Sequence, residues 1–204
     1  MSFQKFSKAH EGSFNSQKYI DQYLLEGRYP KIHSDMHTLI GTHHRLMQEG
    51  RSAINSIDLG SCTGLMCVWL KDVIGGEVIG IEGNKFDFDR AICRDRIIYR
   101  NWYVNPAKME ELCILIRECR ITLIVARRVL SEIGYNDPVI VKMLAALLRE
   151  NGVTDIFLEG RQRVKKPSVP LWNSDLEAAA LQPYYRMVDR HNEVIYMQAV
   201  NNLL

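Results

Sequence analysis

A glycine-containing turn beside two acidic side chains is the part of this sequence best suited to chemistry. Residues 57–64, IDLGSCTG, stand between a β-rich apolar run and a stretch with helical spacing. Gly60 and Gly64 allow a tight strand-to-helix turn, so backbone N–H groups at the helix start can face an anionic or carboxylate-bearing ligand. Asp58, at the carboxyl end of the strand, can accept hydrogen bonds from an ammonium group. These residues predict a ligand site at this turn.

The second acidic residue, Glu82, ends the next β-rich run, 18 residues after Gly64. A doubly wound sheet places a carboxylate there to hold ribose hydroxyls, so the two signals together favour a nucleoside ligand. A dinucleotide is less favoured, because Cys62 and Leu65 occupy two glycine positions of G-x-G-x-x-G and Asp58 would repel a diphosphate. A nicotinamide-dependent oxidoreductase is therefore the least favoured enzyme class.

With these residues, the segment 53–200 resembles the class I S-adenosylmethionine-dependent methyltransferases. Their first-strand motif is an acidic residue followed by Gly-x-Gly-x-Gly, which IDLGSCTG matches except that Cys62 replaces the central glycine. The resemblance implies that S-adenosyl-L-methionine is the cofactor and that Glu82 holds its ribose. By the same resemblance, the residues lining the methionine part are Asp58, Gly60, Ser61, Cys62 and Gly64.

The resemblance assigns two further groups of residues to the site. Asn101 and Trp102 follow the third strand, where the family often contacts the adenine. Ala126 and Arg127 end the fourth strand, where the family lines the transferred methyl group. The pair Arg127-Arg128 could also hold an anionic substrate through bidentate hydrogen bonds.

The elements that must position these residues follow from an alternation of short β-rich runs with helical stretches after residue 53. Predicted strands are 53–59, 77–81, 97–104, 121–126 and 155–158, and predicted helices are 65–73, 86–95, 108–119 and 138–150. Residues 184–189 and 193–200 predict a terminal hairpin. The fold class expected is a three-layer, doubly wound, Rossmann-like α/β sheet, mostly parallel with an antiparallel last strand.

The first quarter of the chain has a different residue pattern from the rest. Helical spacing over 16–50, broken at Gly27 to Pro30, predicts two helices. We expect residues 1–52 to form a helical cap or substrate lid and residues 53–204 to form the domain that binds S-adenosylmethionine.

Catalytic residues cannot be assigned from the pattern, because methyl transfer is an in-line displacement that needs alignment and desolvation more than covalent help. Candidates for a general base are Glu132, Glu159, His37 and His191, and none is favoured. His33 and His37 are four residues apart, but no known metal motif is completed, so a helix with a substrate-gating histidine is expected rather than a metal site.

Composition and short motifs limit which class of methyl acceptor and which cellular compartment we expect. Lys and Arg total 26 against 24 Asp and Glu, so RNA contact would need the local basic segment Arg161 to Lys166. No D/N-P-P-Y/F motif follows strand four and no Pro-Cys dipeptide occurs, which disfavours methylation of DNA bases. Five cysteines without C-x-x-C and no long apolar run predict free thiols, a cytoplasmic protein and no membrane contact.

The sequence thus predicts a methyltransferase acting on a small, anionic molecule. Two alternatives remain open: an RNA or protein methyltransferase that uses residues 161–166, and a non-catalytic subunit that binds S-adenosylmethionine within a complex. A homodimer is also left open.

Overall fold

The computed structural model describes residues 16–50, 53–160 and 173–200. Its centre is a seven-stranded sheet in the order β3-β2-β1-β4-β5-β7-β6, in which β7 alone runs antiparallel to β5 and β6. The strands are β1 (Asn55–Leu59), β2 (Val78–Ile81), β3 (Ile98–Arg100), β4 (Ile121–Arg127), β5 (Asp155–Glu159), β6 (Tyr185–His191) and β7 (Val194–Ala199). The predicted Rossmann-like sheet with an antiparallel strand in its terminal hairpin is confirmed.

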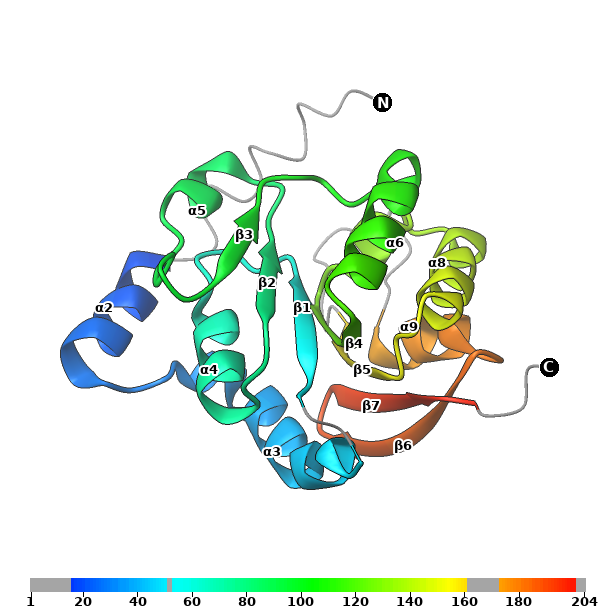
Figure 1. Cartoon of the computed structure of the whole chain (residues 1–204), viewed down its shortest axis with the longest axis horizontal. Helices are drawn as coiled ribbons and strands as arrows, with labels where there is room; N and C mark the ends of the chain where they lie inside the picture. Colours follow the sequence, from blue (N-terminus) through cyan, green and yellow to red (C-terminus); the bar gives the residue numbers. More distant parts are fainter. Residues whose placement is uncertain (1–15, 51–52, 161–172, 201–204) are drawn as a thin grey trace.

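Helices cover both faces of the sheet and make three layers. They are α2 (Ser16–Glu26), α3 (Ser34–Gln48), α4 (Leu65–Val73), α5 (Lys85–Asp89), α6 (Met109–Glu118), α7 (Leu130–Ile133), α8 (Pro138–Glu150) and α9 (Ser174–Leu181). One apolar cluster joins the sheet to α6, α7, α8 and α9, and a second joins the opposite face to α3 and α4. Figure 1 shows α6, α8 and α9 grouped on the right of the molecule, with α2 and α4 on the left.

The central strands are buried along most of their length because both of their faces are covered. Every residue of β2 and β5 is buried, whereas the edge strand β6 is mostly exposed or half-buried. The carboxyl ends of β1, β2, β4 and β5 therefore meet at one edge of a dry sheet, where ligands of doubly wound proteins bind.

The two helix starts at Asp137 and Asn105 are capped by side chains as predicted, but the α-helix after Asn105 begins later than expected. Asp137 accepts a hydrogen bond from the backbone N–H of Val139 at 2.9 Å and starts α8 as predicted. Asn105 caps the chain in the same way, accepting from the N–H of Ala107 at 3.0 Å. The first turn after Asn105 is a 3₁₀-helix, Pro106–Lys108, so α6 begins only at Met109.

Two elements are shorter than predicted. Strand β3 covers Ile98–Arg100 instead of 97–104, because Asn101 turns its side-chain amide to the carbonyl oxygen of Glu82, 2.8 Å away, and leaves the ladder. Helix α5 ends at Asp89 instead of 95. Its last turn tightens and the N–H of Ile92 bonds to the carbonyl of Thr63 at 3.1 Å, which directs the chain back to the turn after β1.

Helix α3 packs against the face of the sheet that α4 also covers. Its buried side chains are Met36, Leu39, Ile40 and Met47, within the cluster that also holds α4. His43 Nε2 lies 2.7 Å from Asp189 Oδ2 in β6, and His191 Nε2 lies 3.6 Å from Asp35 Oδ1. The N-terminus of α3 is therefore placed near the turn between β6 and β7. The expected division at residue 52 stays a prediction.

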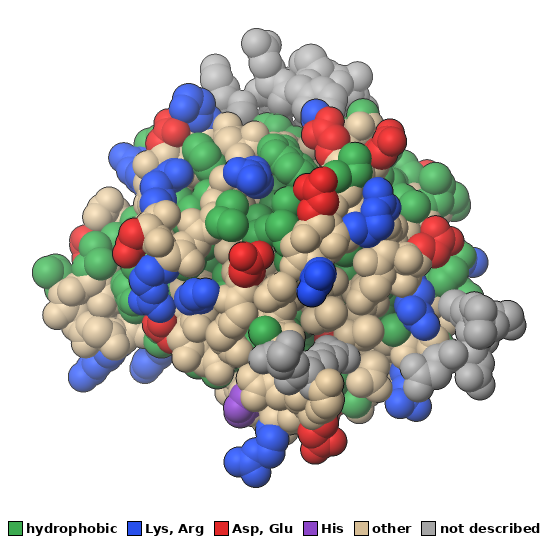
Figure 2. All heavy atoms as spheres, in the orientation of Figure 1, with side chains coloured by type: hydrophobic (Ala, Val, Ile, Leu, Met, Phe, Trp, Pro, Cys, Tyr) green, Lys and Arg blue, Asp and Glu red, His purple; other side chains and the backbone are tan. Residues whose placement is uncertain are grey.

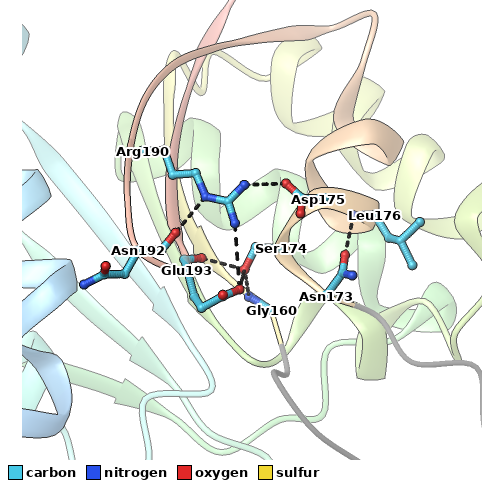
Figure 3. A network of polar contacts seen from close by, with 8 residues as sticks. All are labelled: Gly160, Asn173, Ser174, Asp175, Leu176, Arg190, Asn192 and Glu193. Carbon is cyan, nitrogen blue, oxygen red and sulfur yellow. Dashed lines mark hydrogen bonds and ion pairs between the residues drawn. The ribbon is translucent and has the colours of Figure 1, made fainter.

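A polar network ties α9 to the β6–β7 hairpin and to the end of β5 (Figure 3). Ser174 Oγ accepts from the N–H of Gly160 at 2.9 Å and donates to the carbonyl of Glu193 at 2.5 Å. Arg190 Nη1 lies 2.6 Å from Asp175 Oδ1. The chain that leaves β5 at Gly160 and the chain that enters α9 at Asn173 consequently run in contact, since a Cβ on Gly160 would lie 2.4 Å from the carbonyl carbon of Asn173.

The surface seen in Figure 2 carries Lys and Arg side chains interspersed with Asp and Glu, without a continuous patch of one sign. Across the described ranges, none of the helices combines the length and the apolar character that a bilayer crossing requires.

Candidate functional site

In the turn between β1 and α4, every second residue from Gly60 to Gly64 has a left-handed backbone conformation. The φ angles are +73° at Gly60, +49° at Cys62 and +84° at Gly64. A left-handed backbone conformation costs an L-residue about 1–2 kcal/mol. Cys62 therefore adopts, at a cost in folding free energy, the conformation that a glycine at this position would adopt without strain. Gly64 cannot be replaced in this way, because a Cβ there would lie 1.8 Å from Tyr99 Oη.

Glu82 fixes this turn from the neighbouring strand. Its Oε2 accepts a hydrogen bond from the N–H of Cys62 at 2.8 Å, and its Oε1 accepts from the N–H of Asn84 at 2.6 Å. The residue is only 8% exposed. The structure thus brings together the two predicted parts of the site, the turn and the carboxylate after β2, through a charge-assisted hydrogen bond.

Asp58 lies beneath the turn, 3% exposed, with Cys67 Sγ donating to its Oδ2 at 3.4 Å. Burial raises the pKa of this carboxyl to about 7, since desolvation and the nearby Glu82 charge outweigh the hydrogen bond from Cys67 and the charge of Arg127. The group is therefore poised to lose its proton at neutral pH when a cation approaches.

Two further predicted site residues, Ser61 and Ala126, are buried. Ser61 is buried, and its Oγ lies under the turn, where a Cβ on Gly80 would come within 2.8 Å of it. Ala126 is fully buried in the apolar cluster that α6, α7 and α8 share with the sheet. Ala126 lies in β4, where side chains point to one face of the sheet or the other, so this residue offers a ligand at the edge only its backbone.

Arg127 lies at the carboxyl end of β4, as predicted, and is held by a carboxylate. Its Nε donates to Glu159 Oε2 at 2.6 Å, and Arg128 Nε donates to Glu159 Oε1 at 2.8 Å. Glu159 is buried between the two guanidinium groups, which makes it a poor general base. Two positive charges against one negative leave this Arg127–Glu159–Arg128 cluster with a net positive charge.

An aromatic side chain that the sequence analysis did not select, Tyr103, lies beside Glu82. Its ring packs so closely on Gly83 that a Cβ there would be 2.3 Å from Tyr103 Cδ1, and the residue is 53% exposed. The predicted Trp102 is instead half-buried against the core, and Asn101 is exposed with its amide bonded to the backbone of Glu82. In the sequence, the one feature that indicates a ring packed beside Glu82 is Gly83, which directly follows that residue and has no side chain to block Tyr103.

These side chains form a set of groups, two carboxylates and an aromatic ring, that suits a nucleoside with a cationic amino-acid end. Asp58 matches an ammonium group, Glu82 matches vicinal hydroxyls and Tyr103 offers an aromatic face to a base. Among the described residues, no group of three or more His, Cys, Asp or Glu is arranged to hold a metal ion.

Comparisons with known proteins agree on the fold. No protein-family model matches the chain, and no curated protein matches it. A solved structure of WbdD, titled a bifunctional kinase-methyltransferase, matches with a TM-score of 0.62 at 17% identity over 88% of this chain and 42% of that chain. Monomeric WbdD matches with a TM-score of 0.56 at 19% identity over 79% of this chain and 40% of that one.

Fibrillarin, in its complex with Nop5p, matches with a TM-score of 0.50 at 13% identity over 76% of this chain and 78% of that one. The chain therefore has the Rossmann-like fold found in S-adenosylmethionine-dependent methyltransferases. It spans about two-fifths of the length of the WbdD chains that it matches.

Proposed function

We propose that this chain is a methyltransferase that uses S-adenosyl-L-methionine to methylate a small, anionic acceptor. The observation that carries the proposal is the hydrogen bond from the Cys62 N–H to the Glu82 carboxylate, made within a left-handed turn at the carboxyl edge. This contact joins the carboxylate after β2 to the turn after β1, which supports a ribose subsite at Glu82 beside a methionine subsite at the turn. S-Adenosylmethionine, when bound, supplies an electrophilic methyl group on a sulfonium sulfur.

The residues of the chain would act by binding and alignment. Asp58 would receive the ammonium group and give up its proton, Glu82 would accept hydrogen bonds from the ribose hydroxyls, and Tyr103 would cover the base. Correct placement of two reactants can supply a large part of the barrier reduction for an in-line displacement, so no covalent catalyst is required. The net positive charge of the Arg127–Glu159–Arg128 cluster supports an anionic acceptor.

Calorimetric titration with S-adenosylmethionine, S-adenosylhomocysteine and NAD tests the cofactor directly. We expect the two sulfur nucleosides to bind and NAD not to bind. Glu82→Ala should weaken binding, whereas Glu77→Ala, at an exposed residue before β2, should leave it unchanged. Binding of NAD in preference to the sulfur nucleosides would refute the proposal.

A proton count adds a second test of the same site. Because the Asp58 pKa is about 7, an ammonium group bound beside it should release a fraction of a proton at pH 7. Titrations in buffers of different ionisation enthalpy measure that fraction. Asp58→Asn should abolish the release, and an unchanged release in this variant would place the ammonium elsewhere.

A further inference from the structure

Two imidazole nitrogens are buried in the described part of the chain without a hydrogen-bond partner there: Nδ1 of His33 and Nε2 of His37. Buried polar atoms in folded proteins are nearly always satisfied, so each exception calls for an explanation. Two such atoms on adjacent rings, with centroids 5.7 Å apart and the rings nearly perpendicular, point to a shared polar ligand.

The two rings lie at the carboxyl edge of the sheet. His33 ends the 3₁₀-turn Lys31–His33 and directly precedes α3, and the neighbouring Asp35 lies 3.6 Å from His191 at the end of β6. The following strand, β7, starts at Val194, which pairs with Glu159 at the end of β5. The start of α3 therefore lies near the Arg127–Glu159–Arg128 cluster.

Charge effects support this placement. Burial lowers the pKa of His33 to about 3, with further contributions, in decreasing order, from the charges of Arg127, His37 and Arg128. The charge of Arg127 also lowers the pKa of Asp58. Because the Arg127 guanidinium group acts on both residues, it lies close enough to His33 and to Asp58 to link the start of α3 with the turn after β1.

His37 is held in one orientation by aromatic neighbours. Its ring stacks on Trp69 of α4 at 4.3 Å between centroids and 10° between planes, and Tyr29 meets it edge-on at 5.6 Å. Tyr29 Oη in turn donates to Asp72 Oδ2 at 2.6 Å. A ring clamped in this way can present its free nitrogen at a fixed point, as a preorganised binding group does.

Both rings are neutral at physiological pH, since burial also lowers the pKa of His37 to about 4. A neutral imidazole has one donor nitrogen and one acceptor nitrogen. A hydroxyl group both donates and accepts, so it can satisfy either tautomer. The low pKa values also make the pair unsuited to take up a proton at neutral pH, which argues for hydrogen bonding rather than general-base catalysis.

We propose that His33 and His37 form the acceptor subsite and hydrogen-bond a hydroxyl group of a hydroxylated carboxylic acid, whose carboxylate faces the Arg127–Glu159–Arg128 cluster. The inference rests on the proposed methyltransferase function and specifies its acceptor class. The two histidines bind and orient the acceptor as neutral rings, and neither takes up a proton from it.

The first test measures stability without any ligand. Each of these half-buried rings holds one buried nitrogen without a partner among the described residues, and an apolar side chain of similar size removes its desolvation cost. His33→Leu and His37→Leu should therefore raise the Tm of the free protein. His44→Leu is the matched control on α3, since His44 Nδ1 is bonded to the Gly41 carbonyl at 2.7 Å, and it should lower the Tm. A fall in Tm for both test variants would show that the rings serve the fold and would overturn the inference.

The second test measures binding, using the protein saturated with S-adenosylhomocysteine. Ring resonances of His33 and His37 should shift on addition of 4-hydroxybenzoate, salicylate or lactate, and shift at least ten-fold less at equal concentration with benzoate or propionate. The shifts should disappear in His33→Leu with the affinity for S-adenosylhomocysteine unchanged.

The outcomes separate the two proposals. If S-adenosylhomocysteine binds but none of the three hydroxy acids shifts either ring, the acceptor subsite is refuted and the methyltransferase proposal stands. If S-adenosylhomocysteine itself does not bind, the proposed function fails first. Ring titration with a midpoint near pH 6.5 would also contradict the subsite, because it would show solvated imidazoles.

Discussion

Glu82 should stabilise the fold and the cofactor site through the same two hydrogen bonds. Its carboxylate oxygens accept from the N–H groups of Cys62 and Asn84 at 2.8 and 2.6 Å. Glu82→Ala removes both acceptors and leaves two backbone donors at a site where the original residue is only 8% exposed. The variant should therefore lose stability even without a ligand.

The size of the loss follows from the number and kind of bonds. A hydrogen bond to a charged group contributes about 1.5–3 kcal/mol, and water at the sheet edge would satisfy part of what is lost. We expect a net destabilisation of about 3 kcal/mol. For a domain of this size, each kcal/mol shifts the Tm by about 2–4 °C, so the Tm should fall by about 6–12 °C.

Differential scanning calorimetry of three variants checks this reasoning. Glu82→Gln keeps one acceptor oxygen and should show an intermediate fall in Tm, while Glu77→Ala should show almost none. For variants that remain folded at 20 °C, the affinity for S-adenosylmethionine should fall by on the order of 1–3 kcal/mol, about 5- to 150-fold. A Tm for Glu82→Ala equal to that of Glu77→Ala would refute the role assigned to the carboxylate.

Three further predictions concern the turn and the terminal hairpin. Cys62→Gly should raise stability by up to about 1 kcal/mol in urea unfolding, because relief of the left-handed backbone exceeds the added entropy of the unfolded chain; a loss of stability would mean that thiol packing matters more. The raised pKa of Asp58, about 7 against 3.8, means that ionisation costs folding free energy as pH rises from about 4 to 7. Asp58→Asn should therefore gain stability relative to the wild type between pH 5 and pH 8 while binding S-adenosylmethionine more weakly, and parallel stability curves for the two proteins would contradict this. The hydrogen bond from His43 lowers the pKa of Asp189 in the folded protein. The stability that the ionised Asp189 adds to the fold is therefore present above about pH 4 and is lost as the pH falls below it. Asp189→Asn should consequently be less sensitive to acid between pH 4.5 and pH 3 in thermal scans, and equal acid sensitivity would show that the pair does not hold α3.

The fold was predictable because its elements differ sharply in local pattern. Short β-rich runs mark β1, β4 and β5, which are covered on both faces, and Asp137-Pro138 marks the start of α8. Boundaries failed where long-range contacts decide them. Strand β3 ends early because Asn101 bonds to the backbone of Glu82, a contact between residues 19 positions apart that no local pattern encodes.

The candidate site was predictable only in its main-chain part. The spacing of Gly60, Gly64 and Glu82 identified the turn and its carboxylate, because backbone conformation and strand order together determine both. Side-chain partners were not predictable. The clamp on Glu159 depends on the register of β4 against β5, and the unsatisfied imidazole of His33 depends on where α3 meets the sheet edge.

The contact between Gly160 and the start of α9 has a consequence for the evolution of specificity. Since the two ends of the segment 161–172 meet at one point, its length and sequence can change with little effect on the distance that the rest of the chain must span. Loop-closure entropy grows only slowly with length, by about 0.6 kcal/mol for each doubling. The network of Ser174, Arg190 and Glu193 thus holds both ends in place, so that segments of different composition can be exchanged between them while the sheet and the turn after β1 stay unchanged.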